Sequence, residues 1–136
     1  GFGPGTYAME YGGFQKSRYL TPVSTKQGDT GTAHNEFLLA LSEMGLLGML
    51  IMGAFFVVPL YHGIRGYHRT QDYNRKMLYL GVTFAMVSYD IHAFVNNFMD
   101  QDKIGVTFYG FMAILVSLDR FYLREKRIRK STSAEA

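Results

Sequence analysis

The sequence contains no cysteine, and its net charge is small. Without cysteine, disulfide bonds and thiolate metal sites are excluded. A net charge of +3 is too small to indicate nucleic acid as a partner. The chain also lacks an initiator methionine and a signal-peptide pattern at Gly1, so we expect it to be a fragment of a longer protein.

Apolar residues make up 48% of the chain and are gathered in three blocks, with charged residues between the blocks. We expect an all-α integral membrane protein with three transmembrane helices, at 35–61, 77–95 and 104–120. A helix over 35–61 would be about 40 Å long and would exceed the ~30 Å hydrocarbon core of a bilayer. The alternative is a soluble protein with three buried helices, but uncharged apolar runs of this length are uncommon in core helices.

Cationic residues indicate which way these helices point. They gather in the loop 62–76 and in the basic tail 121–136, which the positive-inside rule places in the cytoplasm. The irregular segment 1–34 and the short loop 96–103 then face outward, to the periplasmic side. Residues 131–136 are small and polar, and we expect them to be disordered.

His34 and Asn35 stand at the outward start of the first helix, followed by Glu36. A helix N-terminus presents unpaired N–H groups and a partial positive charge, and both stabilise a phosphate group. The His34 imidazole could accept a proton from a hydroxyl group or steady a leaving phosphate, and Glu36 could orient it. Gly45 and Gly48 would let a neighbouring helix pack closely. The alternative is that Asn35 only caps the helix and the glycines only pack.

Other polar residues on the outward side are candidates for substrate binding. Lys16, Arg18 and Lys26 are each either a phosphate ligand or a solvated surface charge. Asp90 and His92 lie near the outer end of the second helix, where they either line a cavity or form a polar pair at the membrane edge. The four histidines divide between the two faces and no cysteine is present, so we expect neither a metal ion nor another cofactor.

The spacing of the first group resembles a family signature. His34-Asn35 is followed by nine residues and then by Gly45-Leu46-Leu47-Gly48. This resembles the O-antigen ligase and O-antigen polymerase superfamily, in which an outward loop ends in His followed by Asn, Ser or Gln, then nine residues, then Gly-x-x-Gly. Residues 1–7 are similar to the Gly-x-Gly-x-Gly-aromatic start of that family's large periplasmic loop. Residues 91–98 are similar to the His-containing end of its penultimate helix, and 108–110 to the start of its last helix.

The resemblance covers roughly residues 1–120 and implies the C-terminal part of a multi-pass glycosyltransferase of the bacterial inner membrane. Such enzymes pass a glycan from undecaprenyl pyrophosphate to a hydroxyl of lipid A-core, of a growing O-antigen or of a protein. The implied partners are the lipid-linked donor, the acceptor and membrane lipids, and not nucleic acid. His34 would be the catalytic residue, as general base or as leaving-group stabiliser.

The family places important outward arginines upstream of its Gly-rich segment, so this chain alone is expected to be inactive. The alternative function is a non-catalytic transporter or assembly subunit of the polysaccharide pathway. A transporter should carry its polar groups near the middle of the membrane, whereas here they gather at the outer edge.

Overall fold

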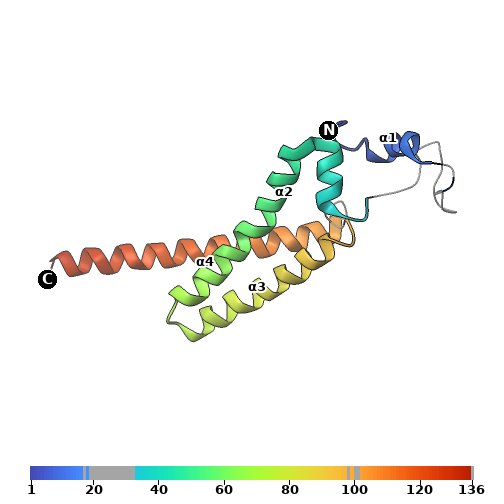
Figure 1. Cartoon of the computed structure of the whole chain (residues 1–136). Coiled ribbons are helices and arrows are strands. Elements are labelled where there is room, and N and C mark those ends of the chain that lie inside the picture. The colour runs from blue at the N-terminus through green and yellow to red at the C-terminus, as the bar shows by residue number, and fades with distance from the viewer. Residues whose placement is uncertain (17, 19–32, 98, 100–101, 136) are drawn as a thin grey trace. The chain divides into compact units, whose positions relative to one another are not determined.

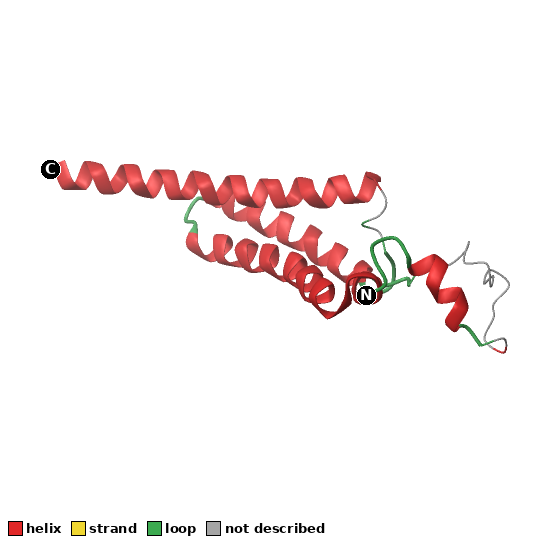
Figure 2. Cartoon of the chain, turned by 90° about the horizontal axis from the view of Figure 1, so that it is seen from above, coloured by secondary structure: helices red, strands yellow, loops and turns green. Residues whose placement is uncertain are grey.

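The computed structural model of this chain describes residues 1–16, 18, 33–97, 99 and 102–135. Helices dominate these residues and no strand occurs among them, so the all-α prediction is confirmed (Figure 1, Figure 2). The helices are α1 (Tyr7–Phe14), α2 (Glu36–Arg69), α3 (Tyr73–Ala93) and α4 (Asp102–Glu135).

The chain divides into two compact units. The first comprises Gly1–Phe55 and Asp90–Gln101, and the second comprises Phe56–Tyr89 and Asp102–Ala136. The first unit therefore contains α1, the beginning of α2 and the end of α3. The second contains the rest of α2, most of α3 and all of α4.

Two helices extend into segments that were predicted to be irregular. α2 continues to Arg69, and only residues 70–72 connect it to α3. The prediction of a loop over 62–76 is therefore wrong for most of that range. Only residues 70–72 are not helical, and the other residues extend α2 and α3. Within the segment 1–34, α1 adds a short helix over Tyr7–Phe14.

The last helix also exceeds its predicted length. α4 runs from Asp102 to Glu135, so the disorder predicted for 131–136 is wrong for residues 131–135. The basic tail is rich in Arg, Lys and Glu, whose straight side chains lose little freedom in a helix. These residues continue the helix beyond the apolar block that sequence periodicity detects.

Helix α2 is interrupted at Gly45, whose φ of 71° and ψ of −166° are not helical. This backbone conformation is open essentially to glycine alone. A break in a helix frees carbonyl groups of the preceding turn. Here the carbonyls of Ser42 and Glu43 accept hydrogen bonds from the N–H groups of Phe2 and Gly3, at 3.0 and 2.9 Å. The Gly-rich start of the chain is therefore docked on the break in α2.

Aromatic rings fill the contacts between the three helices of the second unit. Phe108 of α4 is fully buried. Its ring packs against Phe56 of α2 and Tyr89 of α3, with centroids 5.4 and 5.7 Å apart. α2 approaches α3 closely at Gly66, where any side chain would overlap the ring of Tyr79. The three helices therefore pack directly against one another.

Asp119 of α4 is the centre of a polar cluster in the same unit. Its Oδ1 accepts hydrogen bonds from Arg69 Nη2 at 2.6 Å and from the Tyr79 hydroxyl at 3.0 Å, and its Oδ2 lies 2.8 Å from His62 Nδ1. The Arg69 guanidinium also lies over the ring of Tyr122, 4.0 Å from its centroid. A partly buried carboxylate needs such partners, and here α2 and α3 both supply them.

Within the described residues, two helices are long and apolar enough to span a membrane: Glu36–Arg69 and Lys103–Ser133. Only 17% of the most apolar window of each is buried. Large side chains such as Leu47 and Val106 are 69% and 71% exposed. Apolar surface on this scale requires cover by lipid or by other protein segments.

The third predicted span is not among these two helices. α3 is helical over Tyr73–Ala93 and so covers most of the predicted range 77–95. Polar residues, which include Thr83, Asp90 and His92, interrupt its apolar stretch, so no window of α3 is as apolar as the most apolar windows of α2 and α4. A membrane-spanning position for α3 therefore stays a prediction.

Gly45→Ala is expected to destabilise the protein by about 1–3 kcal/mol, because a side chain is poorly tolerated at this φ and ψ. Gly53→Ala is the matched control, since Gly53 lies in a helical part of α2 and a Cβ there meets no atom within 4 Å. The control should be neutral or stabilising by up to about 1 kcal/mol. Thermal unfolding in detergent, followed by circular dichroism, measures both. Equal melting temperatures would contradict the requirement for glycine at position 45.

Asp119→Asn is expected to lower stability by about 1–3 kcal/mol, because it removes the charge that Arg69 and His62 face. Glu125→Gln is the control. Glu125 pairs with Arg75 through two bonds of 2.6 and 2.8 Å, but the two side chains are 47% and 38% exposed. Its loss should cost about 0–1 kcal/mol. The same melting experiment applies, and a larger effect at Glu125 than at Asp119 would overturn this ranking.

Candidate functional site at the start of α2

His34 lies directly before α2, in the first unit, with an exposed side chain. Its φ is 45°, and it is the one non-glycine residue with a positive φ in the part of the chain that the structure describes. This left-handed conformation costs most side chains roughly 1–2 kcal/mol, although His, Asn and Asp adopt it more readily than others. Backbone strain of this kind is concentrated at functional sites.

Asn35 caps α2 and also ties it to the segment after α3. Its Oδ1 accepts the backbone N–H of Leu38 at 2.9 Å, which is the N-cap bond expected from the sequence. Its Nδ2 donates to the carbonyl of Phe94 at 2.9 Å. The rings of Phe37 and Phe94 stack beside this bond, with centroids 4.8 Å apart. The start of α2 is therefore fixed against the end of α3.

Glu36 is buried, with 2% of its surface exposed. Its Oε1 accepts the backbone N–H of Met99 at 2.7 Å. A carboxylate in the first turn of a helix is stabilised by the helix dipole, and here it also holds the loop that follows α3. The prediction that Glu36 orients His34 is neither supported nor opposed by this bond.

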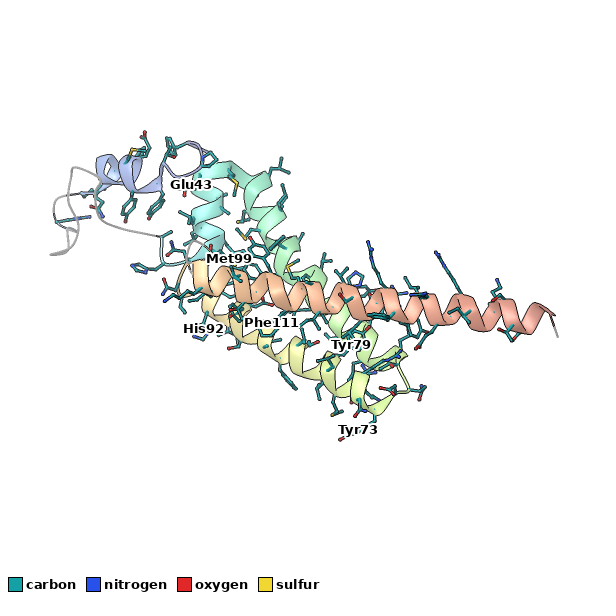
Figure 3. The ribbon with its side chains drawn as sticks, turned by 180° about the vertical axis from the view of Figure 1, so that it is seen from behind. Glu43, Tyr73, Tyr79, His92, Met99 and Phe111 are labelled. Carbon is teal, nitrogen blue, oxygen red and sulfur yellow. The ribbon has the colours of Figure 1, made fainter. Side chains whose placement is uncertain are left out.

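His92 lies in the last turn of α3, in the same unit as His34. Its side chain is exposed, and its carbonyl accepts the N–H groups of Val95 and Asn96 at 3.0 and 2.8 Å. Figure 3 labels His92, near the end of α3, and Met99, in the segment that follows α3. Near His92, one carboxylate oxygen of Asp90 is buried without a hydrogen-bond partner among the described residues.

Gly45 and Gly48 do not act as predicted. They were expected to let a neighbouring helix pack closely as parts of one continuous helix, and the continuous helix is wrong because Gly45 breaks it. Gly48 is buried, and a side chain there would overlap Met44 and come within 3.0 Å of the carbonyl of Ala40. The space at Gly48 is therefore taken by the preceding turn of α2 itself.

Glu43, labelled in Figure 3, connects α2 to α1. Its Oε1 accepts the N–H of Tyr7, the first residue of α1, at 3.1 Å. The rings of Tyr7 and Tyr11 stack with centroids 5.0 Å apart, and Phe2 packs against Phe14 at 5.8 Å. Burial, and to a smaller extent the neighbouring Tyr11, raises the pKa of the Tyr7 phenol. The phenol therefore stays neutral at physiological pH.

The predicted phosphate ligands are less well defined. Lys16 and Arg18 are exposed on the segment that follows α1, and Lys26 lies outside the described residues. Their contact with a phosphate group stays a prediction. Among the described residues, no three His, Asp or Glu side chains are grouped as the ligands of a metal ion.

Sequence reasoning missed the contacts that hold this site together. The bond between Asn35 and Phe94 joins residues 59 positions apart, and that between Glu36 and Met99 joins residues 63 positions apart. No local pattern signals either of them. Comparison of the chain with protein-family models, with curated proteins and with solved structures finds no match.

Removing the side chain of Asn35 should loosen the start of α2. Asn35→Ala loses both the cap and the bond to Phe94 and is expected to cost about 1–2 kcal/mol. Asn35→Asp keeps an oxygen that can accept the N–H of Leu38 but has no amide to donate, so a smaller loss is expected. Melting temperatures of the two variants measure this difference. An alanine variant as stable as the unchanged protein would contradict the role assigned to Asn35.

Proposed function

We propose that this chain is the C-terminal part of a bacterial inner-membrane glycosyltransferase of the O-antigen ligase or O-antigen polymerase type. It would transfer a glycan from undecaprenyl pyrophosphate to an acceptor hydroxyl, on the periplasmic face. The observation that carries the proposal is the spacing of His34-Asn35 and Gly45-x-x-Gly48, which resembles the family signature. The two long apolar helices are compatible with a membrane enzyme.

The contacts within the first unit support this proposal, because they join the motifs that carry the resemblance. The Gly-rich start bonds to the turn that precedes Gly45, through Phe2 and Gly3. Asn35, next to His34, bonds to Phe94, within the segment that resembles the end of the family's penultimate helix. Three motifs that are distant in sequence are thus parts of one assembly around the start of α2.

The chemistry requires a base and a stabilised leaving group. The acceptor oxygen forms a bond to the anomeric carbon of the glycan, and the bond from that carbon to the pyrophosphate oxygen breaks. The hydroxyl proton must leave the acceptor, and the exposed imidazole of His34 can take it. The alternative role for His34 is to stabilise the departing pyrophosphate as a cation.

The charge of Glu36 makes further cations necessary. Its buried carboxylate lies in the first turn of α2 and occupies the positive end of the helix dipole. A pyrophosphate bound beside it would meet a negative charge as well as the N-terminal N–H groups. Lys16 and Arg18, together with the arginines that the resembled family places upstream of its Gly-rich segment, would compensate for that charge.

His34→Asn is the sharpest test of the catalytic role. Asparagine tolerates the left-handed backbone of this position, so the variant removes the base without adding backbone strain. We expect glycan transfer by the full natural polypeptide to fall by a factor of about 10²–10⁴, with membrane insertion unchanged. His68→Ala, at an exposed histidine further along α2, is the matched control and should transfer normally.

Glycan transfer is measured on membranes that contain each variant, and insertion is checked by membrane extraction. Normal transfer by both His34→Asn and His34→Ala would remove the catalytic role. That result would favour the non-catalytic alternative, a transporter or an assembly subunit.

A further inference from the structure

The second unit contains a groove between α2 and α4 that the proposed function does not use. Its volume is about 300 Å³, and most of its lining is apolar, including Pro59 on α2 and Met112 and Val116 on α4. It is also lined by three polar side chains, those of His62, Asp119 and Arg120. The groove therefore combines a mostly apolar lining with a small group of polar side chains.

Among these polar side chains, Asp119 is paired, whereas Arg120 forms no ion pair within the described part of the chain. The carboxylate of Asp119 is already engaged by Arg69, Tyr79 and His62. Arg120 is exposed, and no acidic side chain forms an ion pair with it in the part of the chain that the structure describes. An anion beside Arg120 would thus meet a guanidinium group that no described carboxylate pairs with.

We propose that this groove holds one acyl chain of an anionic phospholipid, with the lipid phosphate bound by Arg120. An acyl chain matches the apolar part of the lining, and a phosphate matches the Arg120 guanidinium beside it. The predicted orientation places the C-terminal part of α4, which includes Arg120, on the cytoplasmic side, where anionic headgroups attract Lys and Arg. The site rests on that membrane orientation but not on the glycan chemistry.

Native mass spectrometry of the full natural polypeptide tests the headgroup. The protein is released from nanodiscs that contain equal amounts of phosphatidylglycerol and phosphatidylcholine with the same acyl chains. We expect about fivefold preferential retention of phosphatidylglycerol, which Arg120→Gln should abolish. Arg124→Gln is the matched control, because Arg124 is exposed on the same helix, one turn further on, and does not line the groove. Its lipid preference should be unchanged.

A second pair of variants tests the apolar part of the lining. Val116→Trp fills the groove and should reduce retention of both lipids. Val106→Trp is its control, since Val106 is 71% exposed on the same helix and lies outside the groove. Melting temperatures confirm that each variant folds.

Three results would overturn the proposal. Equal retention of the two lipids by the unchanged protein would show that the site does not select an anionic headgroup. Retention that Val116→Trp leaves intact would place the lipid outside the groove. Lipid-free protein, whether monomeric or dimeric, would show that the groove is empty or filled by another protein segment. Normal glycan transfer by the His34 variants would remove the catalytic role of His34 but would leave lipid retention at this groove unchanged, so the two proposals fail separately.

Discussion

Backbone N–H and C=O groups need partners wherever a helix begins, breaks or ends, and this constraint explains most of the first unit. At the break in α2, the carbonyls of Ser42 and Glu43 are paired with the N–H groups of Phe2 and Gly3. At the start of α2, Asn35 accepts the N–H of Leu38. These local requirements draw segments that are distant in sequence into one assembly.

Some features of the fold could be predicted from the sequence, and others could not. The apolar blocks predict helices because a helix that is buried or inserted in a membrane needs a continuous run of apolar residues, which can be read directly from the sequence. The predicted start of the first helix, at residue 35, is one position from the observed start at Glu36, since an asparagine cap is a local signal. The break at Gly45 was not predicted, because a glycine that packs and a glycine with positive φ look alike in a sequence. The helical tail was missed because its helix propensity is not accompanied by an apolar face.

The candidate site shows the same division. His34 and Asn35 could be identified from residue type and position, and the structure places them together at the start of α2 with the end of α3 beside them. The carboxylate of Glu36 could be assigned to the first turn, but its bond to Met99 depends on the three-dimensional arrangement. Asp119 drew no attention in the sequence, although three side chains from two other helices converge on it.

The break at Gly45 separates a short leading segment of α2, residues 36–44, from the rest of that helix. Isolated helices shorter than about 12–15 residues are marginal in water, so this segment cannot hold its shape by its own hydrogen bonds. It owes its order to the Gly-rich start of the chain on one side and to the residues after α3 on the other. The position of the His34 imidazole thus depends on two segments that are remote in sequence. A change that loosens either segment would increase the mobility of the imidazole, although His34 itself is unchanged.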